Sequence, residues 1–426
     1  MKEKIPKNVR SQIIFISVAA LGASIFFYFE GGIFNTYINN ILGLEYFFIA
    51  LMVSLSAIMG LIFTFVFGVI SDNTRSELGR RRPYLLFGVI AGITMILYSF
   101  SPSYIWCLIF DVIIIGVAAN AYNAATKVII PDVVAIQYRG RANAITNLTK
   151  TIGGLIPLGL TLLAYEFFTV ESESGLIISQ QGFFFLLLFG GGSFILCAVI
   201  SFLKIKEPLS PSQLPPRKTF KQELKETFNI EALKENKEVF KMILTLTIFN
   251  IGPKVISIYL YLYILSLGLD TLLLILAVAV LGPLTFLSTY LAGKFSDIYG
   301  RKKVAIPLLI ISAIGCVFMP FAGSGNNAII PLLFFGTFFL LQGMTTVKVP
   351  IDAWKQDLLP ENKRAQFAGI MNIANTLNQI PAAFLAAAVA DTFGVQWIFL
   401  VVAIFFAISI PFFYKINETL IEDNLS

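Results

Sequence analysis

The sequence contains no histidine and only three cysteines in 426 residues. Without histidine it has neither a Ser-His-Asp catalytic site nor the commonest proton carrier at neutral pH. Cys107, Cys197 and Cys316 stand far apart within apolar runs, with no CxxC or Cys/His spacing. They are expected to be small buried apolar residues, so disulfides, a metal site and thiol catalysis have no support, and no cofactor is expected.

Charge is also scarce. Charged residues make up 13% of the chain and hydrophobic residues 57%, and the mean hydropathy is +0.81. A soluble domain cannot bury so much apolar surface in one core. Runs long enough to cross a membrane as helices recur throughout, and no short alternating barrel strands are seen. The predicted fold class is therefore an all-α membrane protein with twelve spans, at 12–36, 47–70, 83–100, 104–130, 143–168, 182–203, 241–265, 271–293, 303–322, 328–350, 366–390 and 394–414.

The basic residues fall in alternate loops. The loops on the other side carry no Lys or Arg and hold acids instead, namely Glu45, Glu171, Glu173, Asp270 and Asp391. By the positive-inside rule we expect a multi-pass protein of the cell membrane with both termini in the cytoplasm. The net charge of +6 then reports orientation and not nucleic-acid binding. The first span has no small-residue cleavage site, so no removable signal peptide is expected.

One long hydrophilic stretch divides the spans into six and six. The predicted domains are an N-terminal half at 1–203, a cytoplasmic linker at 204–240 and a C-terminal half at 241–426. The linker begins proline-rich and ends in a mixed-charge helical pattern, so a regulatory or partner-binding helix is the alternative. The two halves also repeat, because "GVISD" at 68–72 and "GKFSD" at 293–297 lie 225 positions apart. This weak internal symmetry is typical of transporters built from parallel halves.

These loops carry a specific motif. G-x-x-x-D followed by G-R-R/K-R/K occurs after the second and the eighth spans, and this pair resembles the signature of the major facilitator superfamily. Within it, "SDNTRSELGRRRPYLL" with "IPDVVAIQYRGRANAI" is similar to the glycoside–pentoside–hexuronide cation symporters and the sucrose-type proton symporters. The resemblance implies two pseudo-symmetric six-helix halves and a secondary transporter that moves a sugar or glycoside-like solute by alternating access. Sodium-coupled members carry acids on the second span, whereas residues 57–71 have none, so proton coupling is expected.

The motif residues are expected to form a cytoplasmic gate. A carboxylate at a helix end is best placed facing the positive N-terminus of another helix, with arginines fixing the geometry. We expect Asp72 and Arg80 to hold the start of the eleventh span, and Asp297 and Arg301 to hold the start of the fifth. A solvated topogenic cluster is the alternative. The predicted gate residues are Gly68, Asp72, Arg75, Gly79, Arg80, Arg81, Asp132, Arg139, Gly293, Asp297, Gly300, Arg301, Asp357 and Arg364.

Ionisable residues inside the spans are functional candidates, because each costs at least about 2.5–3.5 kcal/mol at the bilayer centre. Glu30 and Lys254 lie at near-equivalent positions of the two halves, each beside a helix-breaking pair. We predict that Glu30 is the coupling carboxylate and that Lys254 pairs with it or with the solute. A static ion pair between the halves and snorkelling to the outer interface are the alternatives. Asp111 is predicted as a second ion-coupling residue or a structural acid facing the bundle.

Amides, ammonium groups and an aromatic platform, here Trp354, suit a polyhydroxylated solute, and the lysines favour any carboxylate or phosphate that it bears. Asn120, Asn123 and Lys127 share one face of the fourth span, although hydrogen bonding between helices would also explain the asparagines. Asn147 and Lys150 either extend this polar lining or only pack helices. The predicted solute-binding residues are Asn35, Asn120, Asn123, Lys127, Asn250, Lys254, Gln342, Lys348, Trp354 and Asn375.

Other functions remain open. The lysines suit an organic anion such as a uronide, and the many phenylalanines suit an amphipathic or lipid-like solute. Uncoupled facilitation is the alternative to proton coupling. A non-transporting receptor or assembly factor is the rival from another class, but both gate motifs are intact, which argues against it. With neither a nucleophile beside a base nor a nucleotide-binding loop, no enzymatic activity is expected. The expected partners are the solute, protons and membrane lipid, with no nucleic acid or protein partner.

Overall fold

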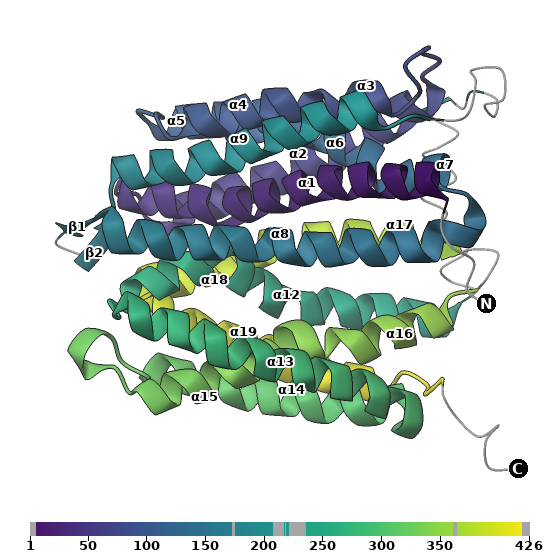
Figure 1. Ribbon diagram of the computed structural model, residues 1–426. Coiled ribbons are helices and arrows are strands. Elements are labelled where there is room, and N and C mark those ends of the chain that lie inside the picture. Colours follow the sequence, from purple (N-terminus) through teal and green to yellow (C-terminus); the bar gives the residue numbers. More distant parts are fainter. Residues whose placement is uncertain are drawn as a thin grey trace, which may run out of the picture. The chain divides into compact units, whose positions relative to one another are not determined.

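The computed structural model describes residues 6–172, 175–207, 217, 219–220, 236–360 and 364–419. These residues are almost entirely helical (Figure 1). The chain separates into two compact units. Unit 1 comprises Met1–Leu44 and Ser54–Glu223, and unit 2 comprises Glu45–Val53 and Leu224–Ser426. The helical pattern expected at the end of the linker, in 221–235, lies outside the described residues.

Unit 1 contains most of the first six spans and one β-hairpin. Its elements are α1 (Lys7–Asn40), α2 (Tyr46–Asn73, whose first residues belong to unit 2), α3 (Arg82–Leu85), α4 (Phe87–Tyr98), α5 (Tyr104–Leu108), the π-helix η1 (Ile109–Ile115), α6 (Gly116–Lys127), α7 (Ile129–Val133), the 3₁₀-helix η2 (Ile136–Tyr138), α8 (Arg139–Phe167), β1 (Thr169–Ser172), β2 (Gly175–Ile178) and α9 (Gln180–Lys204).

Unit 2 holds the remaining spans. Its elements are α12 (Lys237–Ser266), α13 (Thr271–Tyr299), α14 (Arg301–Phe318), the 3₁₀-helices η4 (Met319–Phe321) and η5 (Gly325–Asn327), α15 (Ile330–Leu341), the π-helix η6 (Gln342–Thr346), α16 (Lys348–Leu358), α17 (Arg364–Leu377), α18 (Gln379–Phe393), the 3₁₀-helix η8 (Val395–Trp397) and α19 (Ile398–Tyr414).

The predicted fold class, an all-α membrane protein, is confirmed. Among the described residues, eleven helices are long and apolar enough to cross a membrane. The predicted third span, 83–100, corresponds to a shorter apolar stretch, Arg82–Tyr98, which is divided into α3 and α4. The sequence did not predict the hairpin, in which Thr169 pairs with Ile178 and Val170 with Ile177. These β-branched residues favour strands, but such a short segment has little periodicity to recognise.

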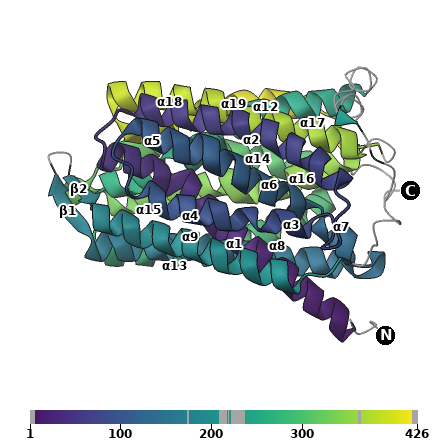
Figure 2. The ribbon, with the colours of Figure 1, turned by 90° about the horizontal axis from the view of Figure 1, so that it is seen from above.

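Small residues let the helices of unit 1 pack closely. α9 lies against both α1 and α4 (Figures 1 and 2). An added Cβ at Gly191 of α9 would lie 2.3 Å from the carbonyl oxygen of Gly92 in α4, so no larger residue fits there without a shift. Similarly, a Cβ at Gly22 in α1 would lie 2.5 Å from the Cβ of Cys197 in α9. Cys197 thus packs as a small buried residue, and Cys107 and Cys316 are likewise buried with free thiols.

Candidate functional site

A charge network joins the ends of three segments of unit 1. Asp132 accepts hydrogen bonds from Nε and Nη2 of Arg80, at 3.1 and 2.5 Å, and from Nε of Arg81, at 3.0 Å. Arg81 also donates to Ser71 Oγ, at 2.5 Å, and to Asp72. The Arg81 side chain is only 3% exposed and that of Asp132 only 11%, so this is a largely buried, multiply hydrogen-bonded ion cluster.

Glu207 closes the same region through the backbone. Its carboxylate accepts hydrogen bonds from the amide nitrogens of Arg80, Arg81 and Arg82, at 2.8–2.9 Å, where α3 begins. The approach depends on Gly79, because a Cβ there would lie 2.6 Å from Glu207 Oε1 and the residue has φ +104°. A carboxylate at a helix N-terminus satisfies amides that have no partner within the helix and complements the helix dipole.

The Arg80 guanidinium lies outside the spans, and its pKa depends on burial and on three nearby acids. Burial on its own lowers its pKa. The hydrogen bond and charge of Asp132, supported by the charges of Asp72 and Glu207, outweigh burial and raise the pKa above its ordinary value. Arg80 therefore stays charged at any physiological pH.

Unit 2 repeats this backbone arrangement. Gly300 has φ +104°, as Gly79 does, and a Cβ there would lie 2.7 Å from Glu418 Oε2. Glu418 accepts hydrogen bonds from the amide nitrogens of Arg301, at 3.0 Å, and Lys302, at 2.8 Å, at the start of α14. Neither capping glutamate was predicted from the sequence, since each comes from a segment that follows a span and lies far from the motif along the chain.

The side-chain network of unit 2 centres on one arginine. Arg301 donates to Ser296 Oγ at 3.0 Å, to Asp297, and to Asp357 Oδ2 at 3.4 Å. This is the set of partner types that Arg81 has in unit 1, whereas alignment of the two motifs on their glycines pairs Arg301 with Arg80. The repeat is thus preserved in contacts but shifted by one residue in sequence.

The other predicted gate residues have local roles. Arg75 donates to the carbonyl oxygens of Asp72 and Thr74. Arg139 donates to the carbonyl oxygens of Pro131, at 2.6 Å, and Val134, at 3.0 Å, and so holds the end of α7. Nothing lies within 4 Å of a Cβ added at Gly68, and at Gly293 the nearest atom is 3.4 Å away. The side chain of Arg364 lies outside the described part of the chain. The predicted latching of the fifth and eleventh spans stays a prediction.

Two carboxyl groups lie close together inside unit 1. Glu30 in α1 and Asp111 in η1 are near enough for the charge of one to act on the other. Asp111 is 3% exposed, its Oδ2 accepts a 2.6 Å hydrogen bond from Ser56 Oγ, and its Oδ1 has no partner among the described residues. Within the described part of unit 1, neither acid forms an ion pair. Asp111 also stands in a π-helical segment, a feature that is frequent at functional sites.

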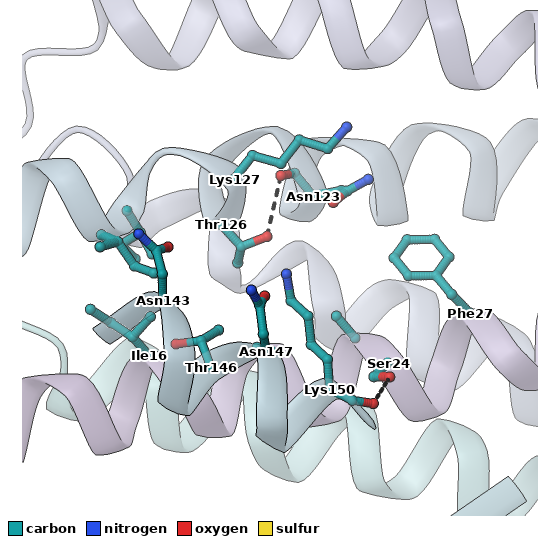
Figure 3. Close-up of a pocket in the computed structure, with 14 residues that line it drawn as sticks. Ile16, Ser24, Phe27, Asn123, Thr126, Lys127, Asn143, Thr146, Asn147 and Lys150 are labelled. Carbon is teal, nitrogen blue, oxygen red and sulfur yellow. Dashed lines mark hydrogen bonds between the residues drawn. The ribbon is translucent and has the colours of Figure 1, made fainter. Parts of the chain in front are cut away.

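A pocket of about 360 Å³ is lined by side chains of α1, α6, α7 and α8 (Figure 3). Its polar lining includes Asn123, Lys127, Asn143, Thr146, Asn147 and Lys150, and Ile16, Phe27 and other apolar residues complete it. Two of the predicted solute-binding residues, Asn123 and Lys127, are therefore brought together here. Asn147 and Lys150 also line it, which agrees with the interpretation that they extend the polar lining and do not only pack helices. Asn143 and Thr146 were missed, although Asn143, Asn147 and Lys150 share one face of a helix.

The other predicted residues of unit 1 serve helix structure. Asn120 donates from Nδ2 to the Gly116 carbonyl oxygen at 2.8 Å, and its Oδ1 accepts a 2.9 Å hydrogen bond from Thr64 of α2. It thus joins two helices, as the packing alternative predicted. Asn35 is 1% exposed and donates to the Gly31 carbonyl oxygen at 2.9 Å.

In unit 2, Lys254 of α12 and Lys348 of α16 are close enough for their charges to interact. Gln342 is 3% exposed in η6. It donates from Nε2 to the Phe338 carbonyl oxygen at 3.1 Å, while its Oε1 has no partner among the described residues. Asn250 and Asn375 are partly buried on α12 and α17.

Trp354 does not fit the aromatic platform expected of it. Its side chain is fully buried, its indole Nε1 donates to the Asn417 carbonyl oxygen at 2.8 Å, and its ring stacks on Phe413. Both ring faces and the only hydrogen-bond donor are therefore occupied by the protein. The sequence shows an aromatic residue beside polar ones, but it does not show which way the ring is turned.

Comparison with family models and with solved structures points to one family of membrane transporters. The family model described as "Major Facilitator Superfamily" matches residues 14–291 and 281–425. A search of curated protein sequences found no match. Among solved structures, the chain is similar to the nucleoside transporter NupG, at TM-score 0.69 and 12% identity, with 95% of this chain and 99% of that chain covered.

Two further structures are comparable. The partially occluded, inward-open xylose transporter XylE from E. coli has TM-score 0.67 and 16% identity, with 97% of this chain and 99% of that chain covered. A bacterial homolog of the human lysosomal transporter Spinster, inward-facing and unoccupied, has TM-score 0.67 and 13% identity, with 96% of this chain and 95% of that chain covered. At these identities the likeness concerns the fold and not the solute.

Proposed function

Since this chain belongs to the major facilitator superfamily, whose members are membrane transporters and not enzymes, we propose that it is a proton-coupled symporter of a sugar- or glycoside-like solute. Transport of a small molecule by an integral multi-pass membrane protein follows from the family. Three further points are proposed: the solute is a sugar or glycoside, the coupling ion is a proton, and the chain is similar to the glycoside–pentoside–hexuronide symporters. The proposal also places the chain in the cell membrane, with both termini and the 204–240 linker between its six-helix halves in the cytoplasm.

The observation that carries the coupling is the acid pair of Glu30 and Asp111. Two neighbouring carboxylates on adjacent spans, with no ion-pair partner among the described residues of unit 1, repel each other. A proton bound to the pair relieves this repulsion, and it supplies a donor for Asp111 Oδ1, which has no partner among the described residues. Proton binding and release at this pair are the chemistry that a proton-driven transporter requires.

The pocket supports the solute class. Its asparagine amides both donate and accept hydrogen bonds, and its threonine hydroxyls do the same, so together they match the hydroxyl groups of a sugar. Its volume of about 360 Å³ falls within the range usual for small-molecule sites. Apolar side chains on the remaining walls suit the C–H faces of a pyranose ring.

The test is uptake into proteoliposomes of labelled sugars, glycosides and uronides under an imposed pH gradient. We expect the wild type to accumulate a member of this panel when the outside is acidic. Glu30→Gln should abolish accumulation but retain exchange of solute, because the variant binds solute without cycling a proton. The matched control is Glu45→Gln, which removes an exposed acid in the turn just before α2. This variant should behave as wild type.

Accumulation by Glu30→Gln at the wild-type level would contradict the coupling role. If no member of the panel moves in any variant that is folded and reconstituted, the sugar or glycoside class is wrong.

A further inference from the structure

We propose that the pocket of unit 1 binds an anionic group of the solute, a carboxylate or a phosphate, between Lys127 and Lys150. The inference deepens the proposed transport function and rests on it. It selects acidic sugars, such as uronates or sugar phosphates, over neutral ones. The shared chemistry is an anion with two or more oxygens, each able to accept a hydrogen bond from an ammonium group.

The charge of the lining is one-sided. Lys127 and Lys150 both line the pocket, and their ammonium groups are near enough for their charges to interact. Of the described side chains that line it, none is acidic. Both lysines are exposed, and two cations this close repel each other unless an anion lies between them. Since the lining does not supply one, the complementary partner is an anion that enters the pocket.

The lysines also have matching neighbours. Asn123 lies one helical turn before Lys127 on α6, and Asn147 lies one turn before Lys150 on α8. Figure 3 shows Asn147 and Lys150 reaching from their helix toward the one that bears Asn123 and Lys127. Each wall therefore presents an ammonium group with an amide beside it, and α8 adds a second amide, Asn143. An acidic sugar matches this set, because its anionic group takes the charges and its hydroxyls take the amides.

The helices that carry these groups are tied together. Ser24 Oγ of α1 donates to the backbone carbonyl oxygen of Lys150 at 2.7 Å, and Ser17 Oγ lies 3.4 Å from Thr146 Oγ1. On α6, the Tyr122 hydroxyl donates to the Ala19 carbonyl oxygen of α1 at 2.9 Å, so α6 and α8 are both tied to α1. These contacts hold the backbone of both walls while leaving the lysine ammonium groups free to reach a ligand.

The anion pocket is separate from the acid pair. Lys127 follows Asp111 by 16 residues, which corresponds to roughly 24 Å along the helix axis. The negative group of the solute and the coupled proton therefore bind at different depths of the same unit. Preference for an anion should depend on the lysines and not on Glu30, which separates this inference from the coupling proposal.

The test is protection of a single cysteine from labelling. Asn147→Cys is made in a full-length variant whose three native cysteines are replaced by alanine, and it is labelled with anionic sulfonatoethyl or cationic trimethylammonium-ethyl methanethiosulfonate. Relative to their rates with a free thiol, we expect the anionic reagent to react about tenfold faster than the cationic one. Glucuronate or glucose 6-phosphate should protect at concentrations about 10–100-fold below those of glucose, as charge-assisted hydrogen bonds require.

The variants make the result specific. Lys127→Gln and Lys150→Gln should each reduce both preferences about tenfold or more, while Lys7→Gln, an exposed lysine of the same unit, should keep them. Protection by glucuronate or by glucose 6-phosphate distinguishes a carboxylate from a phosphate. A Glu30→Gln variant should retain the preference for the anionic ligand.

Equal corrected rates for the two reagents would overturn the inference, as would protection by glucose at the same concentration as both acids. In that second case, proton-driven glucose uptake would leave the proposed function standing. Conversely, an anion preference that depends on the lysines, together with no uptake of any sugar, would keep the anion pocket and overturn the proposed solute class.

Discussion

Ion pairs in this protein differ chiefly in how far their side chains are buried from solvent. Arg81 is almost entirely buried and shares Asp132 with Arg80. Lys355 and Asp352 form an ion pair one turn apart on α16, and the Asp352 side chain is 54% exposed. Removal of one partner leaves an uncompensated buried charge only in the first case, so the two pairs should respond very differently to the same substitution.

We expect Asp132→Asn to destabilise the folded protein by about 3–5 kcal/mol, because it leaves two arginines without their shared carboxylate. Asp352→Asn, which also replaces a carboxylate by an amide, should cost less than about 1 kcal/mol. The measurement is thermal unfolding in detergent for both variants beside the wild type. Equal losses in the two variants would mean that the Asp132 cluster is solvated.

Trp354 gives a second prediction at the residue scale. Trp354→Phe keeps an aromatic ring but loses the hydrogen bond to the Asn417 carbonyl oxygen, so stability should fall by about 1–2 kcal/mol. Because the indole is fully buried against the protein, the concentration of solute that gives half-maximal uptake should stay unchanged. A tenfold or greater increase in that concentration, with stability unaltered, would restore the platform role that the structure does not support.

At the scale of helices, packing in unit 1 depends on where glycine stands on a face. Gly191 and Gly192 are adjacent in α9, yet a Cβ at Gly191 would lie 2.3 Å from the Gly92 carbonyl oxygen, whereas a Cβ at Gly192 meets nothing within 4 Å. Close approach of backbones through small residues is a common way for membrane helices to associate. The two positions therefore separate packing from helix propensity.

Gly191→Ala should destabilise the protein by about 1–3 kcal/mol, since α4 and α9 must move apart to admit the methyl group. Gly192→Ala should be neutral or stabilise it by up to about 1 kcal/mol, because alanine favours the helix. Thermal unfolding of the two variants in one detergent provides the comparison. Similar stabilities for both would show that α4 and α9 adjust freely.

At the scale of the whole molecule, the alternation of basic and acidic loops predicts orientation across the membrane. The loop before α3 contains Arg75, Arg80 and Arg81, while the segment between α4 and α5 has no basic residue. The positive-inside rule then places these two ends of α4 on opposite sides of the membrane, with the arginines in the cytoplasm.

Single cysteines at Glu77 and Ser103 test this orientation in a variant without native cysteines. With an impermeant maleimide applied to intact cells, Ser103→Cys should be labelled and Glu77→Cys should be labelled only after permeabilisation. Both native residues are exposed, so a difference in labelling reports the side of the membrane and not burial. The reverse pattern would invert the predicted topology.

Hydropathy and motif spacing by themselves determined the membrane class, the approximate span positions and the repeat of Asp72 and Asp297, because these depend on local composition and on positions along the chain. Most of the candidate sites depend on which helices become neighbours. Only the tertiary structure turned Asn120 toward α2, buried the Trp354 indole and assembled the pocket from α1, α6, α7 and α8. It also brought Glu207 and Glu418 to helix starts distant in sequence, since side-chain direction and helix neighbours are decided by packing of the whole chain.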